Sequence, residues 1–389
     1  MAIAGITQDE DLALIADLLD IRVENHYPAL EMPPPARLEM TQEVLLRYFK
    51  GLSHQAPVSH IDQAPDAKSI TAGKMLLLFE DLHWIDPSSL ELLDKLLEHL
   101  HVSPTMILMT SRPEFQHDFM PDARVIQITL SRLDQNASRE MVVNLYHAIT
   151  LSDTDVEQIL NKTDGIPLYI EEMTYMVRDL QADPAADVLN NANMSGLGVP
   201  DTLLDLLMER LDHLGPAKKV AQVASVIGQE FLQALLAAVA QMDESVFTAA
   251  LHKVLDSDLI LRLDTHHLKF KHALVENTAY DSILLKARAA LHARVVECLQ
   301  GDFASLVQGA PEIMAHHLAR ANRTLEASRY LLQAGMQTLQ RGAPREAAEH
   351  LKTGLALLKD EADSPAKDEV ELLLLSVLGP TTYGTDGAR

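Results

Sequence analysis

Residues 75–90 read MLLLFEDLHWIDPSSL, and this stretch indicates the fold class of the first half of the chain. The apolar run of residues 75–79 ends in two acids, Glu80 and Asp81. A short, unbroken apolar run is typical of a strand that is buried on both faces of a parallel sheet. The apolar residues that follow have helical spacing over residues 87–100, and Asp86 is placed to cap the start of that helix. The stretch therefore predicts a buried strand, an acidic turn and a helix.

Two further apolar runs, residues 105–110 (TMILMT) and 124–130 (RVIQITL), also predict strands. Strands that alternate with helices indicate an α/β unit with a parallel sheet. We assign this unit to residues 1–180. Its other helices are expected at residues 9–20, 38–52, 134–148, 153–162 and 168–180.

The second half of the chain is mainly helical. Residues 181–199 are small and polar and predict a linker. Residues 200–300 contain several helical stretches and a hairpin formed by 258–263 and 267–271, the pattern of a winged-helix-like domain. Residues 301–389 predict paired helices of the tetratricopeptide-repeat (TPR) type.

Composition limits the functions that the chain can have. It has 389 residues with 32 Lys+Arg and 56 Asp+Glu, a formal net charge of −24. This acidity argues against binding to nucleic acid and to anionic membranes. A single cysteine, Cys298, excludes a disulfide framework and a zinc site built on cysteines. With no apolar segment of membrane-spanning length and no signal peptide, we expect a cytoplasmic protein.

The acids Glu80 and Asp81 have the arrangement of a Walker B motif. A parallel strand delivers such carboxylates to the carboxyl edge of its sheet, where ligands bind. One acid would then hold Mg²⁺ and the next would polarise the attacking water. The alternative is a buried strand that ends in a solvated acidic turn.

Several segments, in order along the chain, resemble those of STAND-class P-loop ATPases, closest to the predicted ATPases associated with adenylate/guanylate cyclase domains. The segments are LLLFEDLHWIDPSSLELLD at 76–94, TSRPEF at 110–115, TDGIPLYIEE at 163–172, PDTL at 200–203, LMERLD at 207–212, FKHALV at 270–275, AHHL at 315–318 and EAAEHL at 346–351. The resemblance implies an AAA-like ATPase region, a winged helix and TPR-like repeats, with ATP or ADP and Mg²⁺ as cofactors. Glu80 and Asp81 would be catalytic and hold the metal.

The resemblance also implies roles for three other residues. Arg112 would be a catalytic sensor for the γ-phosphate; a surface ion pair is the alternative. Pro167 would cover the adenine, although a proline at the first position of a helix needs no ligand. His272 would contact the ADP β-phosphate and lock the closed state; a packed histidine is the alternative. His83 and Trp84 are expected to brace the Walker B turn.

The phosphate-binding loop, G-x-x-x-x-G-K-[ST], is absent from this sequence. Gly73-Lys74 is followed by Met75 and a predicted strand, and position 68 is a lysine. We therefore expect an incomplete P-loop sheet and a fragment, or a degenerate copy, of a longer ATPase. Whether this chain is an enzyme stays open, because ATP hydrolysis rests on the resemblance alone; no cyclase motif is present.

Three functions remain. The first is a regulatory, nucleotide-dependent signalling switch, whose repeats sense a protein partner or a small-molecule signal and which oligomerises in the ATP state. The second is a non-catalytic helical interaction scaffold derived from such an ATPase. The third is a DNA-binding transcriptional regulator, which the net charge of −24 argues against.

Overall fold

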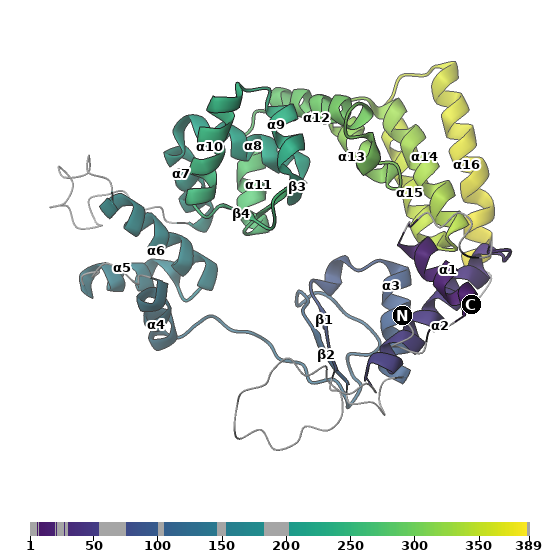
Figure 1. The fold of residues 1–389 in the computed structure, drawn as a ribbon, viewed down its shortest axis with the longest axis horizontal. Coiled ribbons are helices and arrows are strands. Elements are labelled where there is room, and N and C mark those ends of the chain that lie inside the picture. Colours follow the sequence, from purple (N-terminus) through teal and green to yellow (C-terminus); the bar gives the residue numbers. More distant parts are fainter. Residues whose placement is uncertain are drawn as a thin grey trace. The chain divides into compact units, whose positions relative to one another are not determined.

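The structure is a computed structural model, and it describes residues 6, 8–19, 21, 27, 30–53, 75–99, 105–145, 153–182 and 202–386. Of the linker expected at residues 181–199, residues 183–199 fall outside these ranges, and residues 181–182 are helical. The chain divides into two compact units, which are described separately (Figure 1). Unit 1 comprises residues 1–127, 305–319 and 323–389, and unit 2 comprises 128–304 and 320–322.

Unit 1 contains a small parallel sheet and two sets of helices. Its strands are β1 (Met75–Phe79) and β2 (Thr105–Met109), paired in parallel with Leu77 opposite Ile107. Its helices are α1 (Asp9–Leu18), α2 (Pro34–Ser53), α3 (Pro87–His99), α13 (Pro311–Arg320), α14 (Thr324–Gln340), α15 (Pro344–Leu358) and α16 (Pro365–Asp386). The first two predicted strands and the helix between them are therefore confirmed.

One face of the β1–β2 sheet is buried beneath helices. Leu93 and Leu96 of α3 are fully buried, and they pack against strand residues such as Leu77 and Ile107. The stripe of leucines on α3 explains this packing, because apolar residues three or four apart share one face of a helix. α3 thus fixes the sheet edge at which Glu80 and Asp81 emerge.

The opposite face of the sheet is exposed, contrary to the prediction that the strands are buried on both faces. Leu76, Leu78, Met106 and Leu108 are 61%, 54%, 62% and 45% exposed, and we call them the open sheet face. Alternate residues of a strand point to opposite faces, and α3 covers only one of them. Parallel sheets ordinarily carry helices on both sides.

The third predicted strand, at residues 124–130, does not form in the described structure. Its alternating residues Ile126, Ile128 and Leu130 are 85%, 76% and 90% exposed. A strand needs a neighbour for its backbone N–H and C=O groups, and no described segment pairs with this one. The prediction was wrong because a local apolar pattern does not supply the neighbouring strand.

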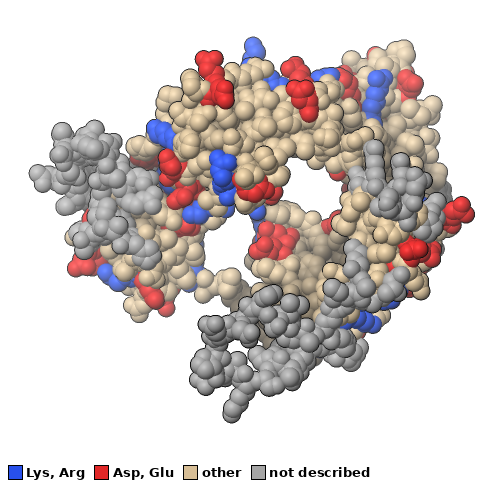
Figure 2. Space-filling model, viewed as in Figure 1, with Lys and Arg blue, Asp and Glu red and all other residues tan. Residues whose placement is uncertain are grey.

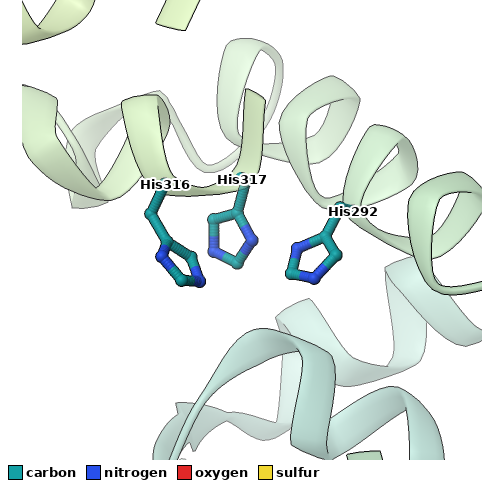
Figure 3. A group of neighbouring side chains, drawn as sticks. All are labelled: His292, His316 and His317. Atoms are coloured by element: carbon teal, nitrogen blue, oxygen red, sulfur yellow. The ribbon is translucent and has the colours of Figure 1, made fainter. Parts of the chain in front are cut away.

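The carboxyl-terminal part of unit 1 is an array of antiparallel helices. α14, α15 and α16 pack side by side (Figure 1). Gly335 of α14 lies against Leu351 of α15, where a Cβ atom would come within 2.9 Å of the leucine side chain. On α13, the rings of His316 and His317 are nearly perpendicular, at 5.3 Å and 83° (Figure 3). The predicted helices of this region are confirmed; their membership of the TPR class is not established by this packing.

Unit 2 begins with three helices around one core. They are α4 (Gln135–Leu145), α5 (Asp153–Thr163) and α6 (Pro167–Ala182). Ile159 of α5 packs with Ile170 and Met173 of α6, all three fully buried. The core also includes Leu206 of the following helix, α7 (Leu203–His213), so α6 is attached to the second half of the unit.

The second half of unit 2 combines helices with a three-stranded antiparallel sheet. Its strands are β3 (Glu230–Leu232), β4 (Ile260–Arg262) and β5 (His267–Phe270), in the order β3-β5-β4. Its remaining helices are α8 (Lys218–Ile227), α9 (Gln233–Ala240), α10 (Glu244–Asp256), α11 (Ala273–Asp281) and α12 (Leu285–Gln300). The predicted hairpin, β4 with β5, is confirmed, and β3 adds a third strand that was not predicted.

The surface of the described residues is mixed in charge. On the face drawn in Figure 2, lysine and arginine side chains are interspersed with aspartate and glutamate, and no broad basic area is visible. No helix in the described ranges is long and apolar enough to cross a membrane.

Candidate functional site

The two acids predicted from the sequence lie at the carboxyl end of β1, beside the end of β2. Backbone hydrogen bonds join these ends: Thr110 N donates to Phe79 O and Leu82 N donates to Thr110 O, each at 2.9 Å. The amide of Asp81 donates to the Thr110 hydroxyl, also at 2.9 Å. Thr110 therefore fixes the turn that carries both acids.

Asp81 has a left-handed backbone, with φ 57° and ψ 47°. Aspartate tolerates this conformation better than most residues do, and the conformation starts the short helix 82–84. The Asp81 side chain is 58% exposed, and His83 Nδ1 lies 4.0 Å from its Oδ1 atom. Glu80 is also exposed. The turn thus presents two carboxylates to solvent at one sheet edge.

Arg112 follows β2 at the same edge of the sheet. Its guanidinium lies 5.7 Å from the centre of the Trp84 ring, a cation–π contact. Trp84 is 67% exposed, whereas its neighbour His83 is largely buried, with its ring 4.5 Å from the indole. Among the described residues, no ion pair to Arg112 is present. The structure brings Glu80, Asp81 and Arg112 to one side of unit 1.

The start of α3 is held by two carboxylates. Asp86 Oδ1 accepts from Ser89 N at 2.9 Å, which confirms the predicted N-cap. Glu346 of α15 accepts from Ser88 N at 2.7 Å. Negative charge is stabilising at this end of a helix. Helix α15 of unit 1 therefore contacts the segment that follows the acidic turn, and no local sequence pattern predicts a contact between residues 258 positions apart.

Pro167 begins α6 and is exposed. The preceding Gly165 has φ 71°, and its carbonyl accepts from Leu133 N at 2.8 Å. A Cβ atom at residue 165 would lie 2.2 Å from Leu133 O, so only glycine fits. The turn places Pro167 at the first position of its helix, the arrangement that needs no ligand; it also leaves the ring accessible.

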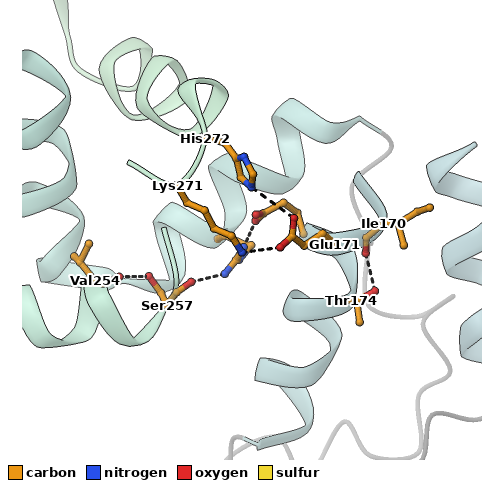
Figure 4. Close-up of polar contacts among 9 residues, drawn as sticks. Ile170, Glu171, Thr174, Val254, Ser257, Lys271 and His272 are labelled. Carbon is orange, nitrogen blue, oxygen red and sulfur yellow. Dashed lines mark hydrogen bonds and ion pairs between the residues drawn. The ribbon is translucent and has the colours of Figure 1, made fainter. Parts of the chain in front are cut away.

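His272 precedes α11 and faces α6 within unit 2 (Figure 4). Its Nε2 atom lies 3.5 Å from Oε2 of Glu171, and Lys271 Nζ lies 2.6 Å from Oε1 of the same carboxylate. Burial lowers the pKa of His272, Glu171 opposes that shift and Lys271 adds to it. We call Glu171, Lys271 and His272 the Glu171 ion cluster. The sequence singled out His272 and missed its two partners.

A second ion pair lies next to this cluster. Glu172 of α6 and Arg210 of α7 form an ion pair whose side chains are 1% and 4% exposed. Arg210 also donates to the Ser257 carbonyl at 2.6 Å and lies over the Tyr175 ring. Burial lowers the pKa of Arg210 to about 10. A sequence signal existed, because both residues belong to motifs of the resemblance, but nothing in it paired them.

The predicted site residues therefore fall into two groups. Glu80, Asp81 and Arg112 belong to unit 1, and Pro167 and His272 belong to unit 2. Exposed carboxylate oxygens are the ligands that Mg²⁺ prefers, so Glu80 and Asp81 fit such an ion.

A third histidine of Figure 3, His292 of α12, has its own partner in unit 2, since its Nε2 lies 3.0 Å from the Tyr280 hydroxyl.

Comparisons with known proteins give few relatives. No family model matches the chain. An uncharacterized protein of Rhizobium meliloti (strain 1021) is 28% identical over 324 residues, which cover 81% of this chain and 31% of that protein. The chain thus spans about a third of the length of this curated relative.

One solved structure is similar in outline. It is a signal transduction ATPase with numerous domains (STAND) with a tetratricopeptide repeat sensor, from Pyrococcus horikoshii. The match covers 97% of this chain and 55% of that chain, with a TM-score of 0.45 and 13% sequence identity.

Proposed function

We propose that this chain is part of a STAND-type regulatory ATPase, a signalling switch whose state depends on the bound nucleotide. One observation carries the proposal: two carboxylates and an arginine emerge from the carboxyl ends of adjacent parallel strands. Ligands of parallel sheets bind at that edge. In this role Glu80 would hold Mg²⁺, Asp81 would polarise the attacking water and Arg112 would bind the γ-phosphate.

Magnesium, when bound, would neutralise the phosphate charge that develops during hydrolysis. The left-handed turn at Asp81, fixed by Thr110, would hold the two carboxylates in place. Arg112 would leave the Trp84 ring to reach a phosphate, since a charge-assisted hydrogen bond is stronger than an exposed cation–π contact.

We also propose that the phosphate-binding loop comes from a segment that this sequence does not contain. The support is the open sheet face: four large apolar side chains are exposed on a sheet of the parallel type, whose faces are ordinarily both covered. A strand and a helix that precede β1 would cover them and supply the loop. The helices α13–α16 would bind the protein or small-molecule signal.

The proposal is tested by calorimetric titration with Mg-ATP. We expect weak or no binding by the present chain, because charge-assisted hydrogen bonds of about 1.5–3 kcal/mol each are missing with the loop. Extension at the amino terminus by a strand and a G-x-x-x-x-G-K-[ST] loop should raise the affinity to the micromolar range. Micromolar binding by the present chain, or none by an extended chain that folds, would contradict the proposal.

A second candidate function is a non-catalytic interaction scaffold. The missing loop and the packed helices α13–α16 favour it. The two functions differ in their response to His272→Ala in the extended chain. The switch requires that the ratio of ADP to ATP affinity changes, because a ligand shifts two states only through differential affinity. The scaffold requires no nucleotide binding in either variant.

A further inference from the structure

A lysine and a histidine of unit 2 share a single carboxylate. Lys271 Nζ and His272 Nε2 lie 2.6 Å and 3.5 Å from the two oxygens of Glu171 (Figure 4). The lysine and the histidine follow strand β5, whereas Glu171 belongs to α6, a hundred residues earlier in the chain. Carboxylate and phosphate oxygens are alternative acceptors for the same donors. Glu171 therefore occupies the position that another oxyanion would need.

The surroundings of Lys271 and His272 are those of an anion site rather than of an exposed ion pair. The side chains of Glu171, Lys271 and His272 are only 17%, 18% and 33% exposed. The Nε2 atom of His272 is buried and forms no hydrogen bond, although it is within ion-pair distance of Glu171. Buried polar atoms ordinarily have a hydrogen-bond partner, so this nitrogen has unused capacity.

The neighbouring arginine has hydrogen-bond acceptors of its own, although the charge of Glu171 also acts on it. Arg210 is buried against Glu172 and donates to the Ser257 carbonyl. The ring of Tyr175 lies beneath both Lys271 and Arg210, at 4.8 Å and 5.6 Å from ring centre to cation. The nitrogen donors available to an incoming anion are therefore the Lys271 ammonium and the His272 imidazole.

We infer that Glu171 is an internal competitor that occupies a phosphate-binding site formed by Lys271 and His272. The inference rests on the proposed function and on the role that the family resemblance implies for His272, contact with a nucleotide β-phosphate, and it adds how that site is regulated. A phosphate must displace Glu171 before Lys271 and His272 can both bind that phosphate.

Displacement would have a structural consequence. Glu171 links α6 to the segment between β5 and α11, so a phosphate on Lys271 and His272 removes that link. Phosphate binding and the Glu171 ion pairs oppose each other. By linkage, each lowers the equilibrium constant of the other by the same factor. Removal of the Glu171 charge should therefore raise phosphate affinity without any other change in the site.

Inorganic pyrophosphate is the probe, titrated calorimetrically into the present chain at low salt. We expect Glu171→Gln to bind it about tenfold or more tightly than the unsubstituted chain, within the usual range of coupling between two ligands. Glu276→Gln is the matched control: Glu276 of α11 is also half-buried, and burial alone raises its pKa. This control removes the same charge but frees no cation, so its affinity should stay unchanged.

Two double variants locate the gain. Both Glu171→Gln/Lys271→Met and Glu171→Gln/His272→Ala should lose it. Equal pyrophosphate affinity of the folded Glu171→Gln variant, the Glu276→Gln control and the unsubstituted chain would overturn the inference. So would a gain that survives in both double variants.

A shorter carboxylate provides a test that does not depend on Glu171→Gln folding. Glu171→Asp keeps the charge and retracts both oxygens, so we expect a smaller gain in pyrophosphate affinity; no gain would overturn the inference. The outcome is independent of ATP hydrolysis. A pyrophosphate gain in a protein whose extended form ignores ATP contradicts the proposed function alone, and ATP binding without the gain contradicts the inference alone.

Discussion

The amide of Asp81 donates a hydrogen bond to Oγ1 of Thr110 at 2.9 Å, and this bond joins the ends of two parallel strands. Asp81 has the left-handed backbone that the bond stabilises, with φ 57°. Both candidate acids leave the sheet from this turn. The bond therefore links the geometry of the candidate site to one hydroxyl group.

Thr110→Val should destabilise unit 1 by about 0.5–1.5 kcal/mol, because it removes the hydroxyl and keeps the shape of the side chain. Trp84, the single tryptophan of the chain, lies in the same turn and reports its unfolding in urea by fluorescence. Thr110→Ser keeps the hydroxyl and is the control. Equal midpoints for the valine and serine variants would remove the role that we give to this bond.

Gly165→Ala should destabilise unit 2 more than Gly215→Ala does. Both glycines have a left-handed backbone, with φ +71° and +56°, which costs an alanine about 1–2 kcal/mol. Only at residue 165 does a Cβ atom meet the backbone, 2.2 Å from Leu133 O; nothing lies within 4 Å at residue 215. Urea unfolding followed by far-ultraviolet circular dichroism measures the difference. Equal stability of the two alanine variants would contradict the close approach of residue 165 to the Leu133 backbone.

Glu172→Ala should destabilise unit 2 by about 3–5 kcal/mol, because it leaves Arg210 buried without its ion-pair partner. Glu349→Ala breaks an ion pair with Lys352 whose side chains are 69% and 54% exposed, and should cost at most about 1 kcal/mol. Glu172→Gln/Arg210→Met should recover part of the loss. Chemical unfolding measures the free energy of unfolding of all three variants. A loss of stability in Glu172→Ala no larger than in Glu349→Ala would contradict the role of the buried ion pair.

Acidification should weaken unit 2 through the Glu171 ion cluster. Burial raises the pKa of Glu171, but the hydrogen bond and charge of Lys271, the charge of His272 and a hydrogen bond from Tyr175 together lower it below 4.5. The pKa of His272 is below 6.5. Both groups therefore contribute stability that is present above their unfolded pKa values and is lost as the pH falls through the folded ones.

The histidine contribution is lost first, as the pH falls below about 6.5. His272→Gln should flatten the decline in unfolding midpoint between pH 7.5 and 5, whereas His266→Gln, at an exposed position of the hairpin turn, should not. Parallel pH profiles for the His272 variant and the unsubstituted chain would contradict the assignment.

The sequence was sufficient to predict elements whose pattern is local. Strands β1 and β2 are unbroken apolar runs, and α3 has both its leucine stripe and its Asp86 cap. The position of Glu80, Asp81 and Arg112 at one edge followed from topology, since parallel strands end on the same side. None of these predictions required knowledge of distant residues.

Features that depend on a distant partner could not be predicted in this way. Residues 124–130 have a strand pattern but no neighbouring strand among the described residues. One face of the β1–β2 sheet is exposed because no helix in the described ranges covers it. Lys271 and Glu171 are a hundred residues apart, and no spacing rule pairs them. The left-handed turn at Asp81 depends on the Thr110 hydroxyl of the next strand.

Steady-state ATP hydrolysis by the chain extended with a phosphate-binding strand and loop tests whether Asp81 polarises the attacking water. We expect magnesium-dependent hydrolysis that falls about a hundredfold or more in Asp81→Asn, because the water-polarising carboxylate is lost. Magnesium binding through Glu80 should survive that substitution and serves as the control. Hydrolysis by Asp81→Asn at the rate of the unsubstituted extended chain would rule out this role for Asp81.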